Sequence, residues 1–464
     1  MFFTHEESAN VKGYNAQPFL HWALGRSWPA FGSELRFLIT LLLLCGLGAE
    51  AQTQIQGQTP ELANLSLSAA NVLLLQNSRE LQAARRAVEA AQAATLTAGA
   101  RPNPNLSLGV GSINPQVGLG AGGLRDKIVD SSIRIDQLVE RGHKLELRVS
   151  TARKLQTASA EDLTDTLRQQ RLALRSGYYD LMLAQDRLAI SVDTAGLYQR
   201  SLQAAELRLK AGDIASSDVA RIRVDALRAQ NDARGAEADR SRAQLVLAYL
   251  IGAERRASEI KATDAWPAEQ ATLAADFNQL IERRADVRAA RTRVDAADAA
   301  RELARSLRTR DLTLGAQFDH YPVNPLYANT SGAGTGNTWG VFVSVPLFTR
   351  YYFEGEIQSA DVAYNTAVDN LERTRALARA DIARARSDVS AAAERLARYR
   401  DSMLAEAKKA ADSAEFAYKN GAIGVMDLLD ARRTLRSIQL DAAAAQADYA
   451  KALAAWQAGL DAAQ

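Results

Sequence analysis

The sequence contains an internal repeat, and this repeat restricts the possible folds more than any other feature. The motif Leu-Ser-Leu-Gly at 106–109 recurs as Leu-Thr-Leu-Gly at 312–315, which is 206 residues later. A Lys-x-Gly motif that ends at Gly212 recurs with its glycine at Gly421, 209 residues later. These spacings predict a chain of two related halves with matching elements. The predicted halves are residues 52–262 and 263–464.

Each half is predicted to contain very long helices. Residues 356–420 include neither glycine nor proline, and as one α-helix they would extend roughly 100 Å at 1.5 Å per residue. Apolar residues recur there every seven positions, which is typical of coiled-coil packing. We therefore predict helical hairpins that pack as coiled coils. One seam position is occupied by Ile382, Val389, Leu396 and Met403, and the other by Ala378, Ala385, Ala392 and Tyr399.

Four short segments have the composition and alternation of β-strands. About ten residues are enough for a tilted strand to cross a membrane. Four strands cannot close a barrel, however, and lipid does not tolerate an open sheet edge. Several chains must therefore share one barrel, in which two copies give eight strands with a filled interior and three give twelve with a lumen. The predicted strands are 104–112, 130–139, 311–321 and 338–348, joined in pairs by Gly/Asn-rich loops at 113–129 and 322–337.

Aromatic residues cluster at the last predicted strand and just after it. This cluster suits a girdle at a membrane–water interface, and it suits a packed junction between strand and helix equally well. Both interpretations stay open at this point. The cluster consists of Trp339, Phe342, Phe348, Tyr351, Tyr352 and Phe353.

The first residues of the chain are typical of an export signal. Residues 1–51 are predicted to be a signal peptide with an extended n-region, whose apolar run at 37–44 is too short to anchor the chain. Cys45 is the only cysteine, and lipidation is not expected because Leu44 precedes it. Cleavage after Ala51 would leave a mature chain without any cysteine, and hence without a disulfide or a thiolate metal site.

The composition excludes several classes of function. Lys and Arg number 56 against 54 Asp and Glu, so the chain lacks the basic excess typical of nucleic-acid binding. His143 and His320 are the only histidines after residue 51, which leaves little scope for acid–base catalysis or a high-affinity transition-metal site. No phosphate loop or nucleophile elbow is present. We therefore expect no enzyme, no cofactor, no resident metal and no nucleic-acid partner.

Taken together, these features resemble the TolC family of outer-membrane efflux proteins. The resemblance rests on the segment at 65–93, on the paired strands and on the two Lys-x-Gly tips, and it covers nearly all of the mature chain. It implies an α+β membrane protein in which three chains form a twelve-stranded outer-membrane barrel, continued by a helical tunnel through the periplasm. It also implies a homotrimer that works with a periplasmic adaptor and an inner-membrane transporter of the resistance-nodulation-division (RND) type.

The resemblance implies a periplasmic gate near the second tip. Asp427 and Asp430 are three residues apart and so share one face of a helix. Three-fold symmetry would gather six carboxylates in a ring that concentrates cations. Without the resemblance, the preferred interpretation is that both are ordinary acidic residues at a helix start, where they favour the dipole, and the resemblance favours the ring.

Further gate residues are implied by matching positions. Asp218 on the first tip and Tyr418 on the second match the family's latch partners. Ile423 stands where a basic latch residue is expected, so we predict a looser latch without a salt bridge. The turns at Gly212 and Gly421 are the implied adaptor-docking tips.

The segment at 135–144 is similar to the heavy-metal-efflux, CzcC-like branch of the family, which points to divalent cations as cargo. Export of drugs or solvents and a type I secretion duct are alternatives within the same class. A secreted coiled-coil scaffold or a periplasmic adaptor is the alternative from a different class. An adaptor would normally carry one helical hairpin, whereas this chain is predicted to have two related ones.

Overall fold

The computed structural model describes residues 61–113, 115, 129–268, 277–322 and 336–460. The predicted signal peptide at 1–51 and most of the predicted loops at 113–129 and 322–337 lie outside these residues. The described residues belong to one compact unit, residues 60–464. The main helices are α2 (Leu67–Asn77), α3 (Arg79–Gly99), α4 (Lys144–Lys210), α5 (Ser216–Ile251), α6 (Phe277–Arg283), α7 (Ala285–Ser306), α8 (Glu354–Arg398), α9 (Leu404–Lys419) and α10 (Val425–Leu460).

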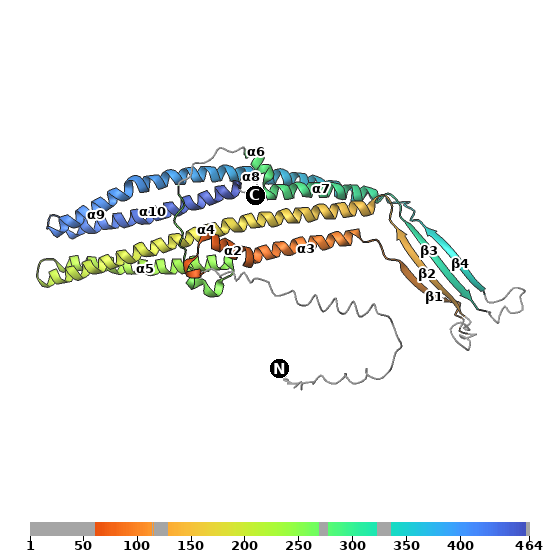
Figure 1. The fold of residues 1–464 in the computed structure, drawn as a ribbon, viewed down its shortest axis with the longest axis horizontal. Coiled ribbons are helices and arrows are strands. Elements are labelled where there is room, and N and C mark those ends of the chain that lie inside the picture. Colours follow the sequence, from red (N-terminus) through yellow and green to blue (C-terminus); the bar gives the residue numbers. More distant parts are fainter. Residues whose placement is uncertain (1–60, 114, 116–128, 269–276, 323–335, 461–464) are drawn as a thin grey trace, which may run out of the picture. The chain divides into compact units, whose positions relative to one another are not determined.

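The long helices are bundled around α4, which has 67 residues. Figure 1 shows α5 beside one part of α4 and α3 and α7 beside the other, while α8 and α10 run together on the side of α7. Both tight turns, α4 to α5 and α9 to α10, lie at the end of the bundle away from the strands. None of the described helices is long and apolar enough to cross a membrane.

The strands form one antiparallel sheet in the order β1-β2-β3-β4. The bounds of β2 match the prediction, and those of the other strands differ by one or two residues, except that β4 ends at Ser344 rather than at 348. Ser344 pairs with Thr313, so only Leu312 of β3 remains beyond it, and Pro346 has no N–H to donate. The strands are β1 (Asn105–Gly111), β2 (Asp130–Val139), β3 (Leu312–Tyr321) and β4 (Gly336–Ser344).

The element order repeats, as the sequence predicts. The series α3-β1-β2-α4-α5 is followed by α7-β3-β4-α8-α9-α10. The two long helices even begin alike, because His143 before α4 and Phe353 before α8 both adopt the left-handed conformation with φ near +60°. The boundaries of the halves, 52–262 and 263–464, stay a prediction.

Most of the predicted heptad seam is buried, but its last member is not. The described core contains Ala378, Ile382, Val389, Ala392 and Leu396. Met403 is 40 % exposed, so its assignment to the seam is wrong. The reason is a π-helical turn at Tyr399–Met403, which changes the phase of the side chains between α8 and α9.

The joint between the halves is packed through buried Tyr178 and the half-buried aromatic residues Tyr179 and Trp266. The Tyr178 hydroxyl donates to the Leu65 carbonyl at 2.8 Å and accepts from the backbone N–H of Asp264 at 3.2 Å. Burial raises the pKa of Tyr178 to about 12. Trp266 stacks on Tyr179 and donates from its indole to Asp186 at 3.0 Å. The segment predicted as a short polar joint is therefore anchored by an aromatic contact.

A buried ion pair fixes the place where β2 passes into α4. The Lys144 Nζ lies 2.8 Å from the Asp311 carboxylate and 2.8 Å from the Thr309 carbonyl, and its side chain is 8 % exposed. The backbone N–H of Arg141 also donates to Asp311, at 2.9 Å. Gly142 lies so close to Thr309 that a Cβ there would come within 2.8 Å of it. These contacts connect the two halves of the repeat.

This ion pair yields a prediction about stability. Asp311→Ala would leave the Lys144 ammonium buried without its counter-ion, which costs about 3 kcal/mol or more. Thermal unfolding of the purified protein in detergent should show a clear loss. The matched control is Asp361→Ala, which removes an exposed pair with Arg305 worth about 1 kcal/mol or less. Equal effects of the two substitutions would contradict this role of Lys144.

Candidate channel gate

Both helical tips have the same turn geometry. After α4, the N–H of Gly212 bonds to the Leu209 carbonyl and that of Asp213 to the Arg208 carbonyl. After α9, the N–H groups of Gly421 and Ala422 repeat this pattern. This is the Schellman motif, which needs a left-handed residue and therefore favours glycine. Gly212 has φ +83° and Gly421 has φ +74°. The repeated Lys-x-Gly motif thus has a structural cause, and its role in adaptor docking stays a prediction.

The two tips pack against each other through a small apolar core. Tyr198 and Leu202 from α4 and Ile222 from α5 are buried in it, and Leu429 from α10 is almost fully buried against them. Because Leu429 lies between Leu428 and Asp430, this contact fixes how the first turns of α10 lie against α4 and α5.

Ion pairs between the hairpins support this packing. Arg433 on α10 reaches Asp225 on α5 at 2.5 Å, and the Asp225 side chain is only 8 % exposed. One turn further along, Arg436 reaches Asp232 at 2.7 Å. Since these pairs join the two halves of the chain, any relative movement of the tips must break or stretch them.

Within one chain, Tyr418 on the second tip contacts Arg208 near the end of α4. The Tyr418 hydroxyl accepts a hydrogen bond from Arg208 Nη1 at 3.0 Å, and the Arg208 guanidinium lies 5.5 Å from the centre of its ring. Asp218 lies in the first turn of α5, half-buried. The described partner of Tyr418 within one chain is therefore Arg208 rather than Asp218. A contact of Asp218 with Tyr418 stays a prediction.

Asp427 and Asp430 lie in the first two turns of α10, and both are exposed. The Asp427 Oδ2 accepts from the backbone N–H of Gly424 at 3.2 Å, as an acidic residue at this position of a capping box does. Asp427 thus acts as a helix-capping acid within the single chain. Both carboxylates are exposed on one helix face and could therefore take part in the predicted ring. The ring itself stays a prediction.

Charged side chains of α9 and α10 pair with one another near the second tip. Lys419 lies 3.0 Å from Glu415, and Arg432 lies 3.3 Å from the same carboxylate. The Lys419 ammonium, with the help of Arg432, holds the pKa of Glu415 below its usual range. Arg432 also donates to the Ser201 hydroxyl on α4 at 2.6 Å.

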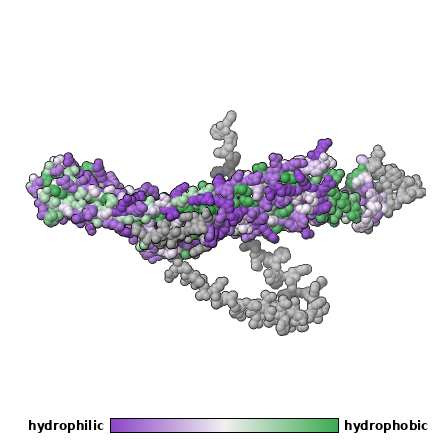
Figure 2. All heavy atoms as spheres, turned by 90° about the horizontal axis from the view of Figure 1, so that it is seen from above, coloured by the Kyte–Doolittle hydropathy of each residue, from purple (hydrophilic) through white to green (hydrophobic). Residues whose placement is uncertain are grey.

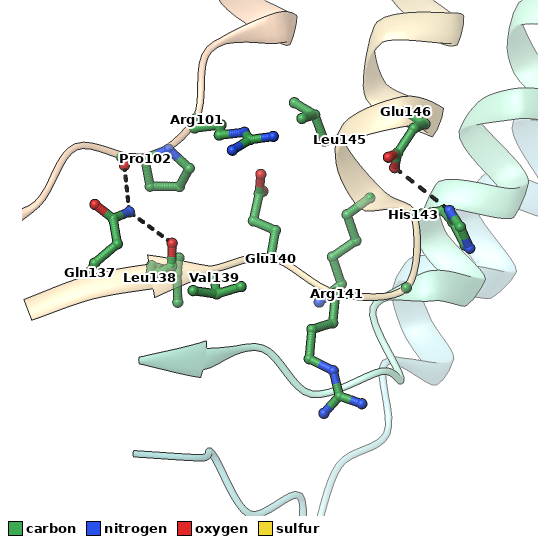
Figure 3. Close-up of a pocket in the computed structure, with 12 residues that line it drawn as sticks. Arg101, Pro102, Gln137, Leu138, Val139, Glu140, Arg141, His143, Leu145 and Glu146 are labelled. Carbon is green, nitrogen blue, oxygen red and sulfur yellow. Dashed lines mark hydrogen bonds and ion pairs between the residues drawn. The ribbon is translucent and has the colours of Figure 1, made fainter. Parts of the chain in front are cut away.

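One pocket lies far from the tips, where the strands meet the helices. It has a volume of about 640 Å³ and lies between the α3–β1 connection and the start of α4. Figure 3 shows Arg101 and Pro102 facing the end of β2, where Gln137 donates to the Pro102 carbonyl at 2.9 Å. His143 and Glu146 also line this opening, with the His143 Nδ1 3.8 Å from the Glu146 Oε2 and both side chains strongly exposed.

This pocket has no metal-binding set. Among the described residues, no three His, Cys, Asp or Glu side chains gather closely enough to hold a metal ion. The segment at 135–144, which suggested cation cargo, instead forms the end of β2 and its turn into α4.

The comparisons with known proteins agree with this geometry. A family model described as outer membrane efflux protein matches residues 71–253 and 277–460. These segments make up well over half of the chain, so the chain belongs to the outer membrane efflux protein family, to which TolC belongs. It is thus an efflux channel of the outer membrane, and it is not an enzyme. The prediction of this family is confirmed, and the alternative of a secreted scaffold or adaptor is wrong.

Individual relatives extend over most of the chain. The cobalt-zinc-cadmium resistance protein CzcC of Cupriavidus metallidurans is 25% identical over 375 residues, which are 80% of this chain and 84% of that protein. The outer membrane protein VceC of Vibrio cholerae has a TM-score of 0.68 at 21% identity, covering 85% and 95% of the two chains. The open state of the MtrE outer membrane channel of Neisseria gonorrhoeae has a TM-score of 0.67 at 18% identity, covering 85% and 88%. The last two likenesses confirm the predicted fold.

Proposed function

We propose that this chain is the exit duct of a tripartite efflux system. Three copies form the duct, which passively conducts divalent heavy-metal cations delivered by an inner-membrane RND pump and a periplasmic adaptor. The observation that carries this proposal is the similarity to CzcC over 80% of the chain, because that relative is named for resistance to cobalt, zinc and cadmium. Duct function itself needs no metal site, since selectivity can reside in the pump.

Assembly from several copies is supported by the two ends of the sheet. In the described sheet β1 and β4 each pair on one side only. Their outward groups would be unsatisfied in lipid, at a cost of several kcal/mol each. The strands also expose apolar side chains, which Figure 2 shows as green surface toward the strand end. These residues include Leu106, Leu108, Val110, Trp339, Val341 and Val343.

The repeat predicts how neighbouring copies pair. Leu108 pairs with Ile133 in the first hairpin. The corresponding residues of the second hairpin, 206 and 210 positions further along, are Leu314 and Val343, and these also pair. A shift of 206 positions therefore converts β1 into β3, a shift of 210 converts β2 into β4, and the pairing register within the hairpin is the same in both.

The same shifts can be applied to the contact between the hairpins. Within the chain, β2 and β3 join the two hairpins, and Ile135 lies opposite Ala316. Moving Ile135 forward by 210 positions and Ala316 back by 206 gives Val345 and Val110. We infer that Val345 of one copy lies opposite Val110 of the next, which closes the sheet into a barrel of twelve strands when three copies assemble.

The tips supply the gate of this duct in our proposal. Asp427 and Asp430 from three copies form a ring of six carboxylates that favours cations. The contact of Tyr418 with Arg208 holds the tip in one arrangement, and Asp218 on the adjacent turn adds the second latch position. Adaptor binding at the turns of Gly212 and Gly421 would open this latch, which lacks a basic residue at Ile423.

The ring can be tested by removing its charge while keeping its shape. Asp427→Asn with Asp430→Asn retains an oxygen that can accept from Gly424, so helix capping is preserved. We expect single channels in planar bilayers to lose most of their preference for cations over anions. Asp441→Asn, which removes an exposed charge further along α10, is the matched control and should change nothing. Unaltered selectivity in the double variant would exclude the ring.

The cargo can be tested by growth of a deletion strain that lacks other ducts of this family. We expect sensitivity to Zn²⁺, Co²⁺ or Cd²⁺ that a plasmid copy of the gene restores. Dyes, detergents and antibiotics, assayed in parallel, should have little effect. Sensitivity to those compounds instead would reassign the duct to drug or solvent export, and sensitivity to nothing would contradict an efflux role.

A further inference from the structure

The inward face of the α8–α9 helix shifts by one residue at the π turn. A seven-residue repeat that continued beyond Leu396 would bury Met403, Glu406, Ala410 and Ser413, yet all four are exposed. The residues that face inward follow a seam displaced by one position. These are Leu404, Ala407, Ala411, Ala414 and Tyr418, which are buried or half-buried.

The hydrogen bonding of the π turn explains this shift. The backbone N–H of Leu404 bonds to the Tyr399 carbonyl, five residues earlier, instead of four as in an α-helix. The wider turn contains one additional residue. Leu396 and Leu404 can therefore lie on the same face although eight positions separate them. Beyond the turn the heptad resumes, since Leu404, Ala411 and Tyr418 are each seven residues apart.

The consequence reaches the candidate gate. Tyr418 is the last member of the shifted seam, and its hydroxyl contacts Arg208 on α4. If the same sequence continued through residues 399–403 as a regular α-helix, Ala417 would occupy the inward position, and Tyr418 would be rotated by about 100° around the helix axis. The π turn thus decides which side chain of α9 faces the first hairpin.

A pocket of about 310 Å³ borders the π turn, α4 and α10. Tyr399, Arg400 and Leu404 line it from the turn, opposite Asp186 on α4 and Gln439 and Gln446 on α10.

We propose that the π turn at Tyr399–Met403 is a positioning element of the gate. It absorbs one residue beyond the heptad and so presents Tyr418 to Arg208. This inference rests on the proposed role of Tyr418 as a latch residue. The placement of Tyr418 can nevertheless be measured without any assumption about cargo or conductance.

Two single-residue deletions separate this proposal from a general need for an intact helix. Deletion of Ser402 shortens the spacing from Leu396 to Leu404 to seven, so a regular α-helix keeps Tyr418 in the seam. Deletion of Ser413, an equally exposed serine in regular helix, moves Tyr418 out of it. Both are made in a chain carrying Arg208→Cys and Tyr418→Cys, and cross-linking by a short bismaleimide is measured in isolated outer membranes.

We expect the Ser402 deletion to keep the cross-linking yield within about two-fold of the parent, and the Ser413 deletion to lower it about ten-fold. An equal loss in both variants would overturn the proposal.

A second measurement does not require a deletion variant to fold. Leu404→Ala should lower the thermal unfolding temperature by more than Met403→Ala, because Leu404 faces inward and Met403 faces outward. The opposite order would overturn the shifted seam. Failure of the metal-resistance or ion-selectivity tests, by contrast, would affect only the proposed function and leave both results unchanged.

Discussion

The structure depends on one constraint, which is that every backbone hydrogen-bonding group of a strand in a membrane must find a partner. The sheet of this chain has four strands, and within the described residues β1 and β4 each lack a neighbour on one side. A single copy cannot meet the constraint in lipid. The sheet therefore requires strands from other copies. Because the long helices continue directly from these strands, pairing of the strands also brings the helices of the copies together.

The internal repeat gives both hairpins the same type of connection between strand and helix. The buried contact of Lys144 with Asp311 joins the first half to the second within one chain. At the corresponding place in the second half, Glu354 begins α8 after a residue with the same left-handed backbone as His143. One type of joint between helix and strand is thus used twice. The Lys144–Asp311 ion pair secures the first of these joints within the chain.

Much of the fold could be predicted from the sequence, because strand alternation and heptads are local patterns. The segment at 130–139 was placed without error, and Ile382, Val389 and Leu396 are buried as expected. Met403 could not be placed, since a π turn leaves the local pattern unchanged until the seam resumes. The partner of Tyr418 was also missed. Arg208 lies 210 positions away, and only the packing of α9 on α4 brings the two side chains together. The role of Asp427 and Asp430 in a ring depends on copies that no local pattern can place.

Cysteine pairing between the sheet edges tests the central claim most directly. In a chain with Val110→Cys and Val345→Cys, oxidation of intact cells should link copies into a covalent trimer on a denaturing gel. The mature chain is predicted to contain no other cysteine, so the links would be specific. The pair Leu108→Cys with Val345→Cys, two residues out of register, should link weakly. A monomer for the first pair, or stronger linking for the second, would contradict the closure of the sheet by neighbouring copies.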